Sequence, residues 1–138
     1  MAFRFGLRSQ ANLLDVHPDL VKVAYRALEL SPVDFTVTEG RRTASKQQEL
    51  FKQHKSQTLA SRHITGHALD VAALVNGKVT WNWAEYELIA TAFKESAAEL
   101  GIPIEWGGDW KSFRDGPHFQ LTHKAYPTRL DATAGEQA

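Results

Sequence analysis

The spacing of apolar residues predicts three helices. Apolar positions recur every three or four residues over 18–30 and again over 83–100, where Gly101 would end the helix. A third segment, 44–54, is rich in Lys, Gln and Glu and follows Thr43, a good N-cap residue. We therefore expect two helices that pack on a core and a third that is largely exposed to solvent.

Shorter segments predict strands. Five of them are apolar or alternate between apolar and polar residues, namely 34–39, 68–75, 78–80, 103–106 and 118–121. Asn76-Gly77 predicts a tight hairpin between the second and third strands. Polar residues 55–61 and the glycine- and tryptophan-rich segment 107–117 are predicted loops. The mixed order of elements predicts an α+β fold, with a small antiparallel sheet flanked by about three helices.

Length and composition predict one compact domain. The chain has 138 residues, of which 43% are apolar, which is enough for a single core. After Tyr126 the composition becomes small and polar. We expect the domain to occupy residues 1–126 and residues 127–138 to form a loose C-terminal tail.

The charge balance and the absence of cysteine exclude several classes of function. Sixteen basic and sixteen acidic residues cancel without forming runs, which argues against binding to nucleic acid or to an anionic membrane. No stretch approaches the ~20 apolar residues of a membrane span, and the start does not resemble a signal peptide, so we expect synthesis in the cytoplasm. Without cysteine, any metal must be held by His, Asp or Glu.

Two histidines and an aspartate lie just before and within the second predicted strand. His63 and His67 have the spacing of an H-E-x-x-H helix, but Ile64 replaces the glutamate and Gly66 would interrupt a helix. The neighbouring residues favour extended structure. In a loop followed by a strand, His63 and Asp70 can converge on one point, whereas His67 need not join them.

A second motif lies before the last predicted strand. Asp115 precedes His118 by three residues across a Gly-Pro turn, so its carboxylate can fold back over whatever His118 binds. A catalytic zinc ion takes three protein ligands, a water and a nearby carboxylate that accepts the water's proton. His63, Asp70 and His118 meet the first need and Asp115 the last. We predict one Zn²⁺ per chain, although cobalt or manganese would also accept these ligands.

The two motifs together resemble a known enzyme family. The pattern S-x-H-x-x-G-x-A-x-D, followed downstream by D/E-x-x-H, is similar to that of the VanY-like zinc D-alanyl-D-alanine carboxypeptidases and L-alanyl-D-glutamate endopeptidases. The matching positions are Ser61, His63, Gly66, Ala68, Asp70, Asp115 and His118. Residues 3–6, 16–20 and 39–43 further resemble the phage-endolysin branch, so the resemblance spans roughly residues 3 to 121.

The resemblance implies roles for individual residues. His63, Asp70 and His118 would bind zinc, and Asp115 would be the general base. An arginine of a G-x-R-[ST] element would stabilise the oxyanion and corresponds to Arg42, with its neighbour Arg41 as the alternative.

Other residues could contact the substrate or the metal ligands. Ser61 lies outside any Gly-x-Ser-x-Gly elbow and is expected to hydrogen-bond to the site rather than to act as a nucleophile. Trp106 and Trp110 could form the wall of a substrate cleft or pack in the core. Gln120 stands where some relatives have Glu, and Phe119 where some have Trp, so another acceptor would have to orient His118 if that carboxylate does so elsewhere.

The family resemblance implies a function. We expect a zinc peptidase that hydrolyses the L-alanyl-D-glutamate bond of peptidoglycan stem peptides, acting as a monomeric phage-type endolysin that lyses bacteria. It would be made in the host cytoplasm and would reach the periplasm and cell wall once a holin or other damage permeabilises the membrane. Two alternatives stay open: cleavage of the D-alanyl-D-alanine bond or another stem-peptide bond, and a zinc-containing module that binds wall peptides without cutting them.

Overall fold

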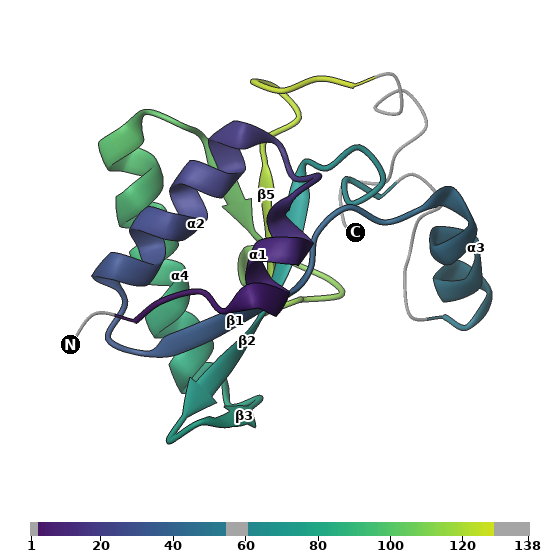
Figure 1. The fold of residues 1–138 in the computed structure, drawn as a ribbon. Helices are drawn as coiled ribbons and strands as arrows, with labels where there is room; N and C mark the ends of the chain where they lie inside the picture. Colours follow the sequence, from purple (N-terminus) through teal and green to yellow (C-terminus); the bar gives the residue numbers. More distant parts are fainter. Residues whose placement is uncertain (1–2, 55–60, 129–138) are drawn as a thin grey trace.

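A computed structural model describes residues 3–54 and 61–128 (Figure 1). Within these ranges the chain is an α+β fold, as predicted. Its elements are α1 (Leu7–Leu13), α2 (Pro18–Leu30), β1 (Asp34–Glu39), α3 (Ala44–Lys52), β2 (Ala68–Val75), β3 (Lys78–Thr80), α4 (Trp83–Leu100), β4 (Ile104–Trp106), a short 3-10 helix η1 (Gly107–Asp109) and β5 (His118–Leu121).

The strands form one antiparallel sheet in the order β1-β2-β5-β4, and β3 pairs with the far end of β2. Asp70 on β2 lies opposite His118 on β5, and Gln120 on β5 lies opposite Glu105 on β4. Residues directly opposite each other point to the same face of a sheet, as do alternate residues along one strand. The register therefore places these four side chains on one face.

The other face of the sheet carries the hydrophobic core. Helices α2 and α4 pack against each other on this side, while α3 lies at the opposite side of the molecule (Figure 1). Leu69 and Phe119 point into the core from the strands and are fully buried. Phe93 of α4 stacks on Phe119 with ring centroids 3.8 Å apart. The apolar side chains thus leave the opposite face free for polar groups.

Helix α1 was not predicted, so the described residues contain four α-helices rather than about three. Polar side chains attach it to β1. The backbone N–H of Val37 donates to Ser9 Oγ at 3.0 Å, and Asn12 Nδ2 donates to the carbonyl of Val37 at 2.8 Å. Because polar side chains make these contacts, the segment lacks the apolar periodicity that reveals a helix.

The other predicted boundaries are close to those observed. The helix predicted over 44–54 ends at Lys52, and the strand predicted from 103 begins at Ile104. Thr43 caps α3 by accepting a hydrogen bond from the backbone N–H of Lys46. The predicted loop 55–61 and the predicted tail 127–138 lie outside the described residues, except for residues 61, 127 and 128. None of the described helices combines the length and the apolar character that a membrane span needs.

Candidate active site

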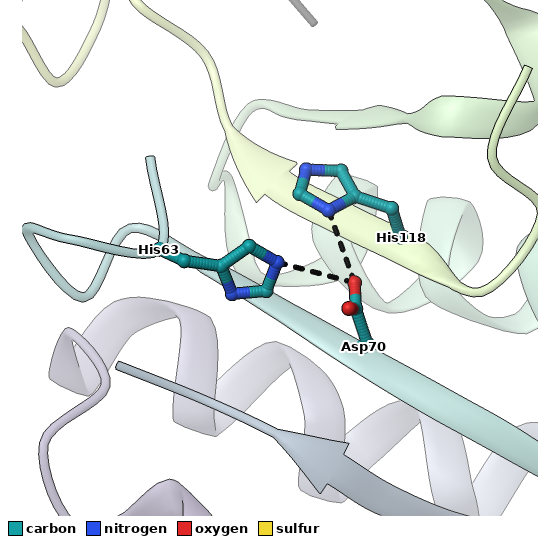
Figure 2. A group of neighbouring side chains, drawn as sticks. All are labelled: His63, Asp70 and His118. Atoms are coloured by element: carbon teal, nitrogen blue, oxygen red, sulfur yellow. Dashed lines mark hydrogen bonds and ion pairs between the residues drawn. The ribbon is translucent and has the colours of Figure 1, made fainter. Parts of the chain in front are cut away.

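His63, Asp70 and His118 converge on the polar face of the sheet (Figure 2). Asp70 and His118 come from neighbouring strands, and a turn that precedes β2 carries His63. Nε2 of His63 lies 3.2 Å from Oδ1 of Asp70, and Nδ1 of His118 lies 3.1 Å from the same oxygen. The three candidate ligand atoms all lie within 4.8 Å of one another, so this group could bind a metal ion.

The imidazole of His63 is held from behind. Its Nδ1 lies 2.8 Å from the carbonyl oxygen of Gly40, which can only accept, so the proton of the neutral ring is on Nδ1. Nε2 then carries a lone pair, and this buried atom has no hydrogen-bond partner. It faces a carboxylate oxygen of Asp70, and two such acceptors repel each other unless a cation lies between them. This arrangement fits a metal ligand.

His118 is oriented in the same way but through the other nitrogen. Its Nε2 lies 2.8 Å from Oε1 of Gln120, which leaves Nδ1 to face Asp70. Gln120 in turn donates from Nε2 to Oε2 of Glu105 at 3.2 Å. The acceptor that the sequence left unassigned is therefore Gln120 itself.

Interactions within the group shift the pKa values of Asp70 and His118. Burial by itself would raise the pKa of Asp70, but the positive charges of His63 and His118 and the hydrogen bond between His118 and Asp70 hold that pKa well below its ordinary value. Burial disfavours the charged form of His118, yet its hydrogen bond and charge interaction with Asp70 raise the pKa of that imidazole.

Asp115 lies on the loop that precedes β5. Its backbone N–H donates to the carbonyl of Gly107 at 3.0 Å, and its own carbonyl accepts from the N–H of His118 at 3.1 Å. Burial, and then the negative charge of Asp70, raise the pKa of the Asp115 carboxyl, while His118, His63 and Arg42 partly oppose the shift. A β-carbon on Gly107 would lie 2.4 Å from the Asp115 carbonyl oxygen, so a glycine is needed at this contact.

Arg42 and Arg41 point to different environments. Arg42 is 8% exposed and donates to the side chains of Glu39 and Gln47, and its backbone N–H donates to the carbonyl of His63 at 2.8 Å. Arg41 is exposed, with Nε 3.3 Å from the carbonyl of Ile64. Of the two arginines, Arg42 is the buried one, and its charge lowers the pKa of Asp115.

The residues predicted to contact substrate have different surroundings. Ser61 is buried, and its Oγ accepts from the backbone N–H of His63 at 3.1 Å, which steadies the turn. Trp106 is 7% exposed and donates from Nε1 to the carbonyl of Gly116 at 2.7 Å. The ring of Trp110 lies 5.1 Å from that of His118, between centroids. Both tryptophans line a cavity of about 460 Å³, which Glu105 and Asp109 also line.

His67 is not part of the ligand group. Its Nδ1 lies 2.8 Å from Oγ1 of Thr65, and its ring lies 5.4 Å from that of His17, between centroids. The glycine in the turn that carries both histidines, Gly66, has a φ of +76°. His63 and His67 thus have different surroundings, although one turn carries both.

The fold and the site together define an α+β protein with a His-Asp-His group, its two histidines buried, that could hold a metal ion. The chain belongs to the family of phage L-alanyl-D-glutamate peptidases, which it matches over residues 1–122. The resemblance seen in the sequence motifs is thereby confirmed.

Individual relatives support the family assignment. The L-alanyl-D-glutamate peptidase of Escherichia phage T5 is 42% identical over 119 residues, which cover 83% of this chain and 87% of the relative. The peptidoglycan L-alanyl-D-glutamate endopeptidase CwlK of Bacillus subtilis is 35% identical over 127 residues, or 78% and 74% of the two chains. The crystal structure of the Serratia marcescens L-Ala D-Glu endopeptidase ChiX matches with a TM-score of 0.88 at 52% identity and covers 92% of this chain and 96% of that one.

Proposed function

We propose that this chain is a zinc-dependent endopeptidase that hydrolyses the L-alanyl-D-glutamate bond of peptidoglycan stem peptides. The observation that carries the proposal is the convergence of two imidazole nitrogens on one carboxylate oxygen, each ring with its other nitrogen hydrogen-bonded to an acceptor. Family membership supports the choice of substrate.

His63, Asp70 and His118 would hold the metal. Two nitrogens and one oxygen are a usual ligand set for catalytic zinc, with one position left open. When bound, zinc supplies a water of lowered pKa and polarises the scissile carbonyl. Elemental analysis of the purified protein tests this choice, and a stoichiometric content of cobalt or manganese in place of zinc would contradict it.

Asp115 and Arg42 would carry out the steps that need side chains. Asp115 accepts a proton from the attacking water and delivers it to the leaving amine. Its raised pKa brings the carboxyl closer to the range in which it can both accept and donate a proton. Arg42 would stabilise the negative charge that develops on the carbonyl oxygen. Its hydrogen bonds to Glu39 and Gln47 hold the guanidinium in place before substrate binds.

The scissile bond is tested directly. Purified stem peptide is incubated with the enzyme and the products are identified by mass spectrometry. We expect a new amino terminus at D-glutamate. Release of D-alanine with the L-alanyl-D-glutamate bond intact would contradict this choice and favour the carboxypeptidase alternative.

The Asp115→Ala variant separates an enzyme from a module that only binds wall peptides. We expect it to keep the fold and zinc but to hydrolyse stem peptide about 10²- to 10⁴-fold more slowly, since a positioned base contributes a factor of that order. Lysis of outer-membrane-permeabilised cells and hydrolysis of purified stem peptide are measured together. Equal activity of the variant would remove Asp115 from the mechanism.

The cellular setting is part of the proposal. We propose that the chain acts as a monomeric phage-type endolysin, made in the host cytoplasm and admitted to the wall when a holin or other damage opens the membrane. Expression with and without a holin in a bacterial host tests this. Lysis only with the holin supports the proposal, and rapid lysis without it contradicts that part.

A further inference from the structure

Three side chains form a hydrogen-bonded row behind the proposed metal site. Oε2 of Glu105 accepts from Nε2 of Gln120 at 3.2 Å, and Oε1 of Gln120 lies 2.8 Å from Nε2 of His118. The sheet register places Glu105 opposite Gln120, and strand alternation places Gln120 on the same face as His118. Gln120 and His118 are fully buried, whereas Glu105 is half-buried.

The row determines which nitrogen of His118 carries the proton. Nδ1 faces Asp70, so metal binding through Nδ1 requires the proton to be on Nε2. An amide at position 120 could present either its oxygen or its NH₂ group to Nε2 of His118. The oxygen favours the proton on Nε2, while the NH₂ group would favour it on Nδ1 and block the ligand atom.

Glu105 resolves this choice. An ionised carboxylate only accepts hydrogen bonds, so it pairs with the NH₂ group of Gln120 and turns the amide oxygen toward His118. The opposite orientation would place an amide oxygen against the carboxylate. We propose that Glu105 is a positioning residue that, through Gln120, keeps His118 in the tautomer whose Nδ1 can bind the metal. The inference rests on the proposed metal site and deepens it.

The residue types at positions 105 and 120 therefore depend on each other. A glutamate at position 120 would accept the His118 proton directly, but its carboxylate would then face the carboxylate of Glu105, and like charges at such a distance repel. With glutamine at position 105 the repulsion disappears, because an amide can donate to the new carboxylate. Exchanging the two residues should therefore preserve the row.

The test measures zinc affinity by competition with a chromogenic chelator. Glu105→Gln allows both orientations of the Gln120 amide. The fraction of molecules in which Nδ1 of His118 can bind the metal then falls to about one half, and zinc binding weakens about twofold. Glu105→Lys can only donate, reverses the amide and should weaken binding about tenfold or more, within the range for residues that orient ligands. The exchange E105Q/Q120E should bind within about twofold of the native chain, and Gln120→Glu alone should bind more weakly than the exchange.

Two control variants separate this effect from general changes. Asp109→Lys makes the same charge change as Glu105→Lys, at a residue that lines the same cavity as Glu105 but lies outside the row. Glu87→Gln alters an exposed side chain of α4. We expect Glu87→Gln to bind like the native chain and Asp109→Lys to bind more tightly than Glu105→Lys. Equal weakening by the two lysines would overturn the proposal, because charge alone would then account for it.

The tautomer can be observed without a metal. Nitrogen-15 NMR of the metal-free protein, at a pH where His118 is neutral, should show the proton on Nε2 in the native chain and on Nδ1 in Glu105→Lys. An unchanged tautomer and unchanged zinc affinity in Glu105→Lys would overturn the inference while leaving the proposed metal site intact. A native chain that does not bind zinc would overturn both.

Discussion

His63 and His118 approach Asp70 through different ring nitrogens. His118 lies directly opposite Asp70 in the sheet and uses Nδ1, the nitrogen nearer its backbone. His63 comes from a separate turn and reaches the same oxygen with the more distant Nε2. Each ring has an acceptor behind it, so both are fixed before a metal binds. The site therefore needs little rearrangement on binding.

Asp70 links the stability of the metal-free protein to pH. Its lowered pKa stabilises the fold above about pH 4, and this contribution is lost as pH falls through its folded value. The raised pKa of His118 stabilises the fold below about pH 6.5, and this contribution is lost as pH rises through its folded value. The difference in free energy of unfolding between the native chain and Asp70→Asn should therefore be largest between about pH 4 and 6.5. Urea unfolding in chelator measures this, and a difference that does not vary with pH would contradict it.

Arg42 and Arg41 provide a matched pair for testing the proposed oxyanion role. Arg42→Lys keeps the charge but cannot reproduce the planar fork that binds Glu39 and Gln47 together. We expect kcat to fall about 10²-fold with a small change in KM, since removing one oxyanion donor costs about 10²- to 10³-fold. Arg41→Lys should stay near the native rate. Steady-state kinetics on stem peptide measures both, and an equal loss in the two variants would count against a special role for Arg42.

The sequence motifs located the three candidate ligands, but only part of what holds them. Gln120 could be placed on the face of His118, because alternate residues of a strand share a face. Gly40 and Glu105 could not be connected with the histidines. Their contacts depend on which loop lies behind His63 and which strand lies beside β5, and local sequence does not encode strand order.

At the scale of elements, local sequence predicted those that have an apolar period, a good cap residue or a strong turn signal. Helix α4 and strand β2 have the predicted bounds, because their apolar spacing and flanking turn residues are strong signals. Helix α1 was missed because polar side chains attach it to β1. The segment predicted as a loop between β4 and β5 contains η1, whose three residues are too few to show a helical period.

Gly40, whose carbonyl faces His63, packs closely against the end of α1. A β-carbon there would lie 1.9 Å from the carbonyl oxygen of Asn12 and 2.8 Å from Cγ2 of Val16. Gly40→Ala should therefore lower the free energy of unfolding by about 1–3 kcal/mol, the usual cost of overpacking. It should also weaken zinc binding, because the Gly40 carbonyl orients His63.

Gly6→Ala is the control for Gly40→Ala. A β-carbon on Gly6 would meet nothing within 4 Å. Urea unfolding and zinc titration of both variants measure the two effects. If the two variants were equally stable, close packing at Gly40 would not be the reason for its glycine.

At the scale of the whole molecule, the sheet separates two functions. Helices α2 and α4 cover one face, which provides the hydrophobic core, and the other face carries the site (Figures 1 and 2). The fold therefore does not depend on a metal for its core. We expect the metal-free protein to remain folded.

Metal removal should still lower the melting temperature. A ligand that binds only the folded state adds about 2.7 kcal/mol at a free concentration one hundred times its Kd. Calorimetry with chelator and with added zinc measures the shift, which should persist in Asp115→Ala and disappear in Asp70→Ala. A shift of the same size in Asp70→Ala would place the ion elsewhere.

The pairing of β2 with β5 also determines when the ligand group can assemble. Asp70 and His118 are 48 positions apart in the chain, so they meet only after the intervening hairpin and long helix have been brought together. Closing such a long segment costs chain entropy, and this cost arises before an ion can bind to both residues and stabilise the pairing. We expect an ion to bind to both residues only after these two strands have paired. Such an ion would slow unfolding and leave the folding rate unchanged.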